Sequence, residues 1–126
     1  MKMFVVDAFT DVLFKGNPAA VCFVTHWPAD QVMQNIAKEN RFSETAFAIK
    51  KTDVNYDLRW FTPGGEIDLC GHATLATGYV VFQNDAPAHS NTITFNTQSG
   101  QLRVTQKNDL YEISRSSGSP VIDRFG

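Results

Sequence analysis

The sequence predicts an α+β fold in which a barrel of β-strands surrounds one central apolar helix. Residues 71–82 have helical length and are apolar on nearly every side, so a helix here must be enclosed by protein. About seven other segments have the composition and alternation of strands, and one more is an amphipathic helix. Strands wrapped around the apolar helix, with the amphipathic helix outside, account for this inventory in a single domain.

The first third of the chain predicts a hairpin followed by the amphipathic helix. Residues 3–9 are rich in Phe and Val, and the turn signal Gly16-Asn17-Pro18 separates them from a second strand at residues 19–24. Pro28 begins the helix and Asn40 ends it. The face of this helix that we expect to be buried carries Val32, Ile36 and Ala37.

The remaining strands follow from alternation between turn signals. Five are expected, at residues 43–49, 56–61, 92–97, 101–106 and 110–114. Residues 50–53 form a turn between the first two of these strands. The last residues are rich in Ser, Gly and Pro, so we expect a domain over residues 1–115 and a flexible, divergent tail over residues 116–126.

Charge and hydropathy exclude several partner classes. The 11 basic and 13 acidic residues give a formal charge of −2, which argues against a nucleic acid or an anionic membrane as partner. The longest uncharged run, between Asp68 and Asp85, is shorter than the ~20 residues that span a bilayer. The N-terminal apolar run is too short for a signal peptide, so we expect a cytoplasmic protein with Cys22 and Cys70 reduced.

Motifs for metals and nucleotides are not found in the sequence. His26, His72 and His89 lack ligand spacing and have no accompanying cluster of Cys or carboxylates, so no metal is expected. The chain has neither a glycine-rich dinucleotide fingerprint nor a phosphate-binding loop. We therefore expect neither a metal site nor a nucleotide-binding site.

The start of the apolar helix is the best candidate site. The unpaired N–H groups of a first helical turn and the positive end of the helix dipole attract anions. Gly71 allows close backbone approach, so its amide and that of His72 are placed to grip a carboxylate or a phosphate. The His72 side chain either donates to that ligand or simply caps and packs the helix. Glu66 and Asp68, near the helix entry, are expected to act as caps.

Glu44 is the candidate acid or base. On a strand it shares one face with Phe42, Ala46 and Ala48, and a carboxylate held among apolar side chains suits proton transfer. The alternatives are a Glu that reaches solvent from a strand edge and a carboxylate paired for structural reasons.

Two further residues each have two alternative roles. Cys70 directly precedes Gly71 and is either an acid/base thiol or, as we favour, a buried and unreactive one. Asn17 is either a turn residue or a ligand-binding amide. Cys22 lies in an apolar strand and is expected in the core.

Taken in order, these motifs resemble the N-terminal half of the phenazine biosynthesis PhzF-like family, relatives of diaminopimelate epimerase and proline racemase. The resemblance covers about residues 1–113. It rests on five segments: Asp7-Ala8-Phe9-Thr10, Gly16-Asn17-Pro18, Phe42-Ser43-Glu44-Thr45, Arg59-Trp60-Phe61-Thr62-Pro63 and Leu69-Cys70-Gly71-His72-Ala73.

The resemblance implies a diaminopimelate-epimerase-like lobe and a cofactor-free isomerase or epimerase of small amino-acid-like carboxylic acids. The family's catalytic glutamate falls on Glu44, and its substrate-binding Gly-His pair falls on Gly71 and His72, next to Ala73. In the racemase and epimerase relatives a catalytic Cys stands where Cys70 is, and the epimerases place a substrate-contacting Asn near Asn17.

Members of the family have two pseudo-symmetric lobes with the active site between them, and the resemblance places this chain on one lobe. The first hypothesis is an enzyme whose cleft is completed by a second lobe or by a second copy, as a homodimer through the cleft face. The alternative is a truncated, non-catalytic half-protein that serves as a binding or interaction module.

Overall fold

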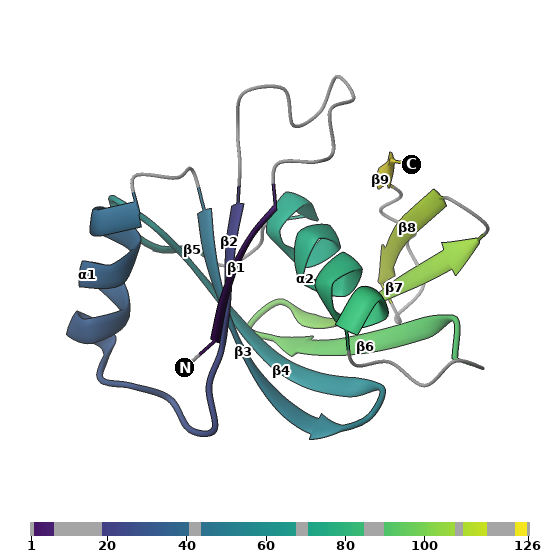
Figure 1. Cartoon of the computed structure of the whole chain (residues 1–126), viewed down its shortest axis with the longest axis horizontal. Helices are drawn as coiled ribbons and strands as arrows, with labels where there is room; N and C mark the ends of the chain where they lie inside the picture. Colours follow the sequence, from purple (N-terminus) through teal and green to yellow (C-terminus); the bar gives the residue numbers. More distant parts are fainter. Residues whose placement is uncertain are drawn as a thin grey trace.

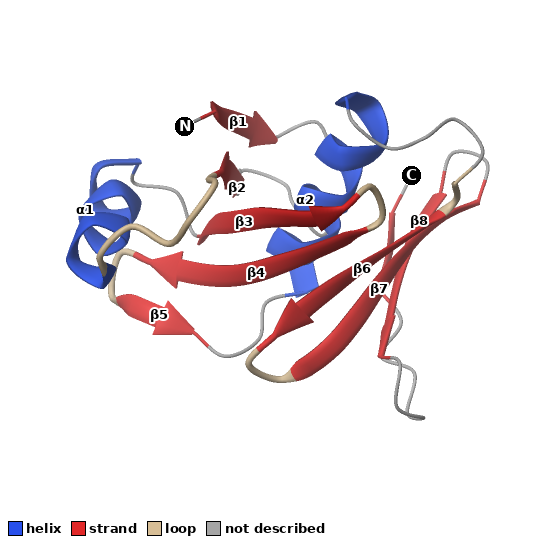
Figure 2. Cartoon of the chain, turned by 90° about the horizontal axis from the view of Figure 1, so that it is seen from below, coloured by secondary structure: helices blue, strands red, loops and turns tan. Residues whose placement is uncertain are grey.

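A curved mixed sheet encloses helix α2 on its inner face and carries helix α1 on its outer face (Figures 1 and 2). The structure, a computed structural model, describes residues 2–6, 19–40, 44–67, 71–84, 90–107, 110–115 and 123–125. The elements in chain order are β1 (Lys2–Val6), β2 (Ala19–Phe23), α1 (Asp30–Asn40), β3 (Glu44–Thr52), β4 (Asn55–Thr62), β5 (Gly65–Ile67), α2 (Gly71–Asn84), β6 (Thr92–Thr97), β7 (Gly100–Lys107), β8 (Leu110–Arg115) and β9 (Asp123–Phe125).

The strands follow the order β1-β2-β3-β4-β6-β7-β8-β9, and β5 pairs with β4 beside β6. Most neighbours are antiparallel, but β2 pairs with β3 in parallel because α1 carries the chain back between them. β4 and β6 are also parallel, with α2 as part of their connection. The predicted pairing of the first two strands is confirmed, with Met3 opposite Cys22.

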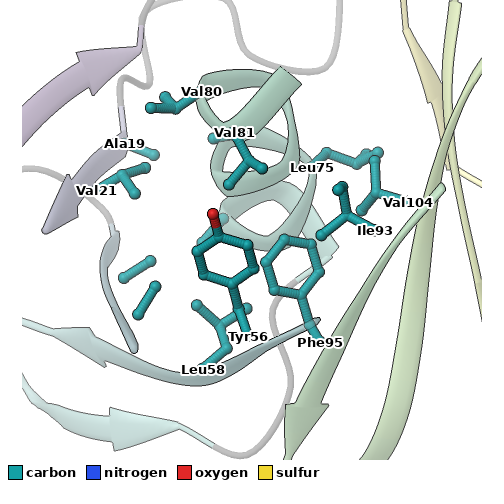
Figure 3. Close-up of a cluster of buried hydrophobic side chains, with 14 of the residues drawn as sticks. Ala19, Val21, Tyr56, Leu58, Leu75, Val80, Val81, Ile93, Phe95 and Val104 are labelled. Carbon is teal, nitrogen blue, oxygen red and sulfur yellow. The ribbon is translucent and has the colours of Figure 1, made fainter. Parts of the chain in front are cut away.

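Helix α2 is buried as its composition predicts. Leu75, Ala76 and Val81 are fully buried and pack against strand residues such as Tyr56 and Phe95 (Figure 3). The polar residue Thr77 is accommodated because its hydroxyl donates a 2.7 Å hydrogen bond to the carbonyl of Ala73, one turn earlier. No helix in the described ranges is long and apolar enough to cross a membrane.

Helix α1 covers the outer face of the sheet through a narrow apolar stripe. Met33 and Ala37 are fully buried there against Cys22, Phe47 and Phe61. The prediction for Ala37 is confirmed, whereas Val32 was wrongly placed in the core.

Val32 is 47% exposed. The stripe is centred one residue later than predicted, so Met33 takes the position that the periodicity had assigned to Val32.

The predicted closed barrel is not observed. Within the described part of the chain, β1 and β9 are the two ends of the sheet and do not pair with one another. Closure needs a specific stagger over all strands, which alternation along each strand does not encode.

The strand inventory also differs from the prediction. β5 and β9 were not predicted, and β3 continues through most of the expected turn at residues 50–53. β8 ends at Arg115, the last residue of the expected domain, and the expected tail lies outside the described residues apart from β9.

Gly78 sets how closely α2 approaches the sheet. A Cβ atom at this position would lie 2.7 Å from Cγ1 and 2.9 Å from Cβ of Val104 on β7. Real Cβ atoms do not come so close to other carbons, and Val104 is fully buried in a strand, so it has little room to yield. The absence of a side chain at residue 78 therefore allows α2 to contact β7.

Gly78→Ala should destabilise the protein by about 1–3 kcal/mol through overpacking. An exposed helical Gly→Ala change would instead stabilise by roughly 1 kcal/mol, so the sign of the change is diagnostic. Urea unfolding of the single variants and of Gly78→Ala with Val104→Ala measures the coupling, and the double variant should lose less stability than the sum of the two. A Gly78→Ala protein as stable as the parent would refute the close contact.

Candidate functional site

Glu44 and the first turn of α2 lie at the same end of the sheet. Glu44 is the first residue of β3 and pairs with Ala19, which in turn pairs with Val6 at the end of β1. In Figure 1 the start of α2 lies at the same, upper end of the sheet, where β1 ends and β3 begins. At its other end α2 lines a pocket through Asn84, together with Lys2 at the start of β1. The elements thus bring the predicted carboxylate and the predicted anion-binding helix start to one rim.

Glu44 is half-buried on the inner face of the sheet. Ala46 and Ala48, on the same face of β3, belong to the core around α2. Thr45, which follows Glu44 in the sequence, is fully buried. Its hydroxyl lies 3.4 Å from the side-chain amide of Asn40 at the end of α1. A carboxylate at the edge of an apolar core, still open to solvent on one side, is suited to exchange a proton with a bound molecule.

The start of α2 provides backbone donors rather than side chains from its buried face. Gly71 is the first residue of the helix, and the N–H groups of a first helical turn point out of the helix toward a ligand at its start. Ala73 is fully buried in the core, and its methyl group packs there. Its contribution to ligand binding can come only from the backbone. His72 lies in this first turn, whereas Asn17 and Cys70 lie outside the described residues.

An ion pair fixes the strand that leads into the helix. Arg59 on β4 donates to both carboxylate oxygens of Glu66 on β5, at 2.7 Å each, and also binds Asp30 of α1 at 3.1 Å. The guanidinium lies 5.4 Å from the ring centres of both Trp27 and Phe61. The hydrogen bonds to Glu66 raise the pKa of Arg59 further above its usual value.

Glu66 is therefore not the helix cap that the sequence predicted. The forked pairing with Arg59 holds β5 against β4 and so orients the chain shortly before Gly71.

Trp60 places a polar N–H group near this rim, and the sequence predicted no functional role for this residue. It pairs with Ala46 across the β3–β4 ladder and is 1% exposed. Its indole N–H is buried and has no hydrogen-bond partner among the described residues. The alternation of the strand places Trp60 on the same apolar face as Tyr56 and Leu58, so its burial could be predicted from the sequence. The lack of a partner for the N–H depends on tertiary packing, which the alternation does not show.

No group of three or more His, Cys, Asp or Glu side chains within the described ranges is arranged to hold a metal ion. The groups at the rim are suited to proton transfer and to anion binding. Glu44 supplies the titratable group and the first turn of α2 supplies the donors.

Comparisons of the sequence and the fold with known proteins identify relatives of this chain. The sequence profile of phenazine biosynthesis-like proteins, PhzC-PhzF, matches residues 6–126. A protein of Pseudomonas aeruginosa named an uncharacterized isomerase is 50% identical over 109 residues, which are 86% of this chain and 41% of that protein.

Solved structures agree. The crystal structure of a PhzF-family phenazine biosynthesis protein from Enterococcus faecalis has 53% sequence identity and a TM-score of 0.78, over 88% of this chain and 42% of that one. A probable proline racemase from Agrobacterium radiobacter shares the fold at 9% identity, with a TM-score of 0.59 over 79% of this chain and 38% of its own. The chain thus spans 41%, 42% and 38% of the length of these three relatives.

The buried cysteine yields a test of the core behind the site. Cys22 is a free, fully buried thiol, as expected from the sequence, and burial raises its pKa from 9.0 to about 11. Between these values the folded chain keeps a proton that the unfolded chain releases. The free energy of unfolding therefore falls as pH rises from about 9 to about 11.

We expect Cys22→Ala to weaken this dependence. Urea unfolding of the parent and of Cys22→Ala at about pH 8 and about pH 10.5 isolates the thiol, because all other titrating groups are shared. In a Cys70→Ser background the native protein should also resist alkylation until it unfolds. Equal pH dependence in the parent and in Cys22→Ala would contradict the burial of this thiol.

Proposed function

The chain belongs to the phenazine biosynthesis-like (PhzC-PhzF) family, and on this premise we propose that it is one lobe of a cofactor-independent isomerase or epimerase. The substrate class is a small amino-acid-like carboxylic acid. Relatives named as isomerases support the reaction type. The observation that carries the proposal is the position of Glu44 at the same rim as the start of α2.

In this proposal each residue has a chemical role. The backbone amides of Gly71, His72 and Ala73 bind the substrate carboxylate, assisted by the Asn17 amide. Glu44 takes a proton from carbon, and the electron pair left behind is delocalised toward the bound carboxylate. Glu44 then delivers the proton to a second carbon, which takes up the electron pair, so that the substrate is isomerised and no net acid or base is consumed. His72 donates a hydrogen bond to the substrate, and Cys70 is the second candidate for the acid or base.

The proposal includes a second wall for the site. The chain covers 41% of the P. aeruginosa relative and 42% of the E. faecalis structure, so a whole relative has room for a second lobe. In this proposal the second wall is formed either by a second lobe or by a second copy of this chain. The second copy would pair through the rim of Glu44 as a homodimer. The alternative function is a binding or interaction module without turnover, because a lone lobe has the anion-binding helix start but only one face of the cleft.

Glu44→Gln should reduce proton exchange at least about 100-fold, because the amide cannot accept the proton. The measurement is the incorporation of deuterium from D₂O at carbon-bound positions of small amino and hydroxy acids, followed by NMR. Asp53→Asn is the matched control, since Asp53 is exposed in the turn after β3, at the opposite end of that strand from Glu44, and it should exchange like the parent. Exchange that persists in Glu44→Gln would remove this residue from the mechanism.

Light scattering on a size-exclusion column separates the two forms of the proposal. A dimer whose formation is weakened by reversal of the charge at the rim, as in Glu44→Arg, would support a cleft shared between copies. A charge change at the opposite end of β3, such as Lys50→Gln, should leave the dimer intact. A monomer at all concentrations would exclude a self-completed cleft and leave the binding module or a separate second lobe.

A further inference from the structure

The end of the lobe opposite Glu44 contains a pocket of about 370 Å³. It lies where β1 begins, β2 ends and α2 ends. This volume is within the range of small-molecule sites in proteins. The residues that line it are Lys2, Phe4, Phe23, Val24, Thr25, Lys50, Tyr56, Val80, Val81 and Asn84.

The floor of the pocket is a packed aromatic and aliphatic surface. The Phe4 and Phe23 rings meet edge to face at 5.8 Å, and Phe23 meets Tyr56 in the same way at 6.1 Å. Tyr56 is fully buried beside Val80 and Val81 of α2 (Figure 3). Because these side chains are held by the main core, the floor is preformed and can receive an apolar group without rearrangement.

Two lysines stand on the inner face of the sheet around this floor. Lys2 is two residues before Phe4 on β1, and Lys50 is two residues after Ala48 on β3, so both follow the inward alternation of their strands. Each can lay its methylene stem along apolar surface and place its ammonium group at the mouth. Lys50 also makes an exposed 3.3 Å ion pair with Asp53.

The charge balance at the mouth favours an anion. The C-terminal end of α2 carries about half a negative charge, which opposes an anionic ligand. The two lysines carry two positive charges against this half charge and the single exposed carboxylate of Asp53, so the mouth keeps a net positive charge. The Asn84 side chain donates a 3.0 Å hydrogen bond to the Val80 carbonyl at this helix end. The adjacent Lys51 points to the other face of β3, where it pairs with Asp57 at 3.6 Å.

We propose that this pocket binds a small amphipathic anion, with an aromatic or branched aliphatic body on the floor and a carboxylate between Lys2 and Lys50. The site lies at the opposite end of α2 from Glu44. It is therefore separate from the proposed active site and goes beyond the proposed function.

The test is an NMR titration of the full 126-residue chain with 3-phenylpropionate. Saturable shifts should appear at Phe4, Phe23, Val80 and Val81, and the neutral analogue 3-phenylpropanol should bind clearly more weakly. The double variant Lys2→Gln/Lys50→Gln should weaken binding of the acid about tenfold, as expected for two partly exposed charge contacts. Lys51→Gln is the matched control and should stay within about twofold of the parent.

Three results would overturn the proposal. One is the absence of saturable shifts up to about 10 mM acid. Another is equal binding of the acid and the alcohol, or unchanged binding by the double variant, since either removes the role of the lysines. The third is a set of shifts confined to the first two turns of α2, which would place the acid at the rim of Glu44 and support the proposed function instead.

Discussion

The fold depends on one constraint: helix α2 has no polar face and must be enclosed. A helix that exposes Leu75, Ala76 or Val81 to water would lose about 1–3 kcal/mol for each large apolar side chain left uncovered. The sheet therefore curves around the helix, and the strands place their alternate residues against it. The tight contact at Gly78 is a consequence of the same enclosure, because the helix fills the space so fully that no side chain fits there.

Enclosure also gives the two ends of α2 different chemistry. Most of the helix surface is sealed by the core, so the two ends of the helix are its most accessible parts. At one end the first turn of α2 lies at the rim of Glu44, and at the other the last turn lines a pocket together with Lys2 and Lys50. The sheet residues at each rim carry the charge that the helix dipole itself attracts, a carboxylate at the positive start of α2 and two ammonium groups at its negative end. A ligand carboxylate at the start of α2 must therefore share the dipole with Glu44, whereas the two lysines exceed the half charge of the helix end and can still bind an anion.

The sequence predicted those parts of the fold that local patterns determine. The apolar run from Gly71 identified the buried helix, and alternation identified the long strands, because both patterns have short periods that appear in any window. Strand β5 was missed because three residues carry no alternation, and its pairing depends on the ion pair between Arg59 and Glu66, seven residues apart. The stripe of α1 was misplaced by one residue because Val32 and Met33 are equally apolar, and only packing on Phe47 and Phe61 decides between them. For the candidate site, the sequence motifs identified Glu44 and the start of α2 as the groups that could carry the chemistry. That Glu44 and the start of α2 share one rim required the register of β1, β2 and β3.

The proposed chemistry follows from having one carboxylate on one wall. Inversion at a single carbon needs one group to remove the proton and another to deliver it from the opposite face. Migration of a proton between two carbons needs only one base, if both carbons lie on the same side of the substrate. With Glu44 at the rim and the carboxylate anchored at the first turn of α2, the groups described on this chain form a single wall and suit proton migration. Epimerisation would require a second acid facing Glu44, and that group would have to come from Cys70, from a second lobe or from a second copy. The stereochemical outcome of the reaction therefore depends on what closes the cleft, and the oligomeric state of this chain is a question about mechanism as well as assembly.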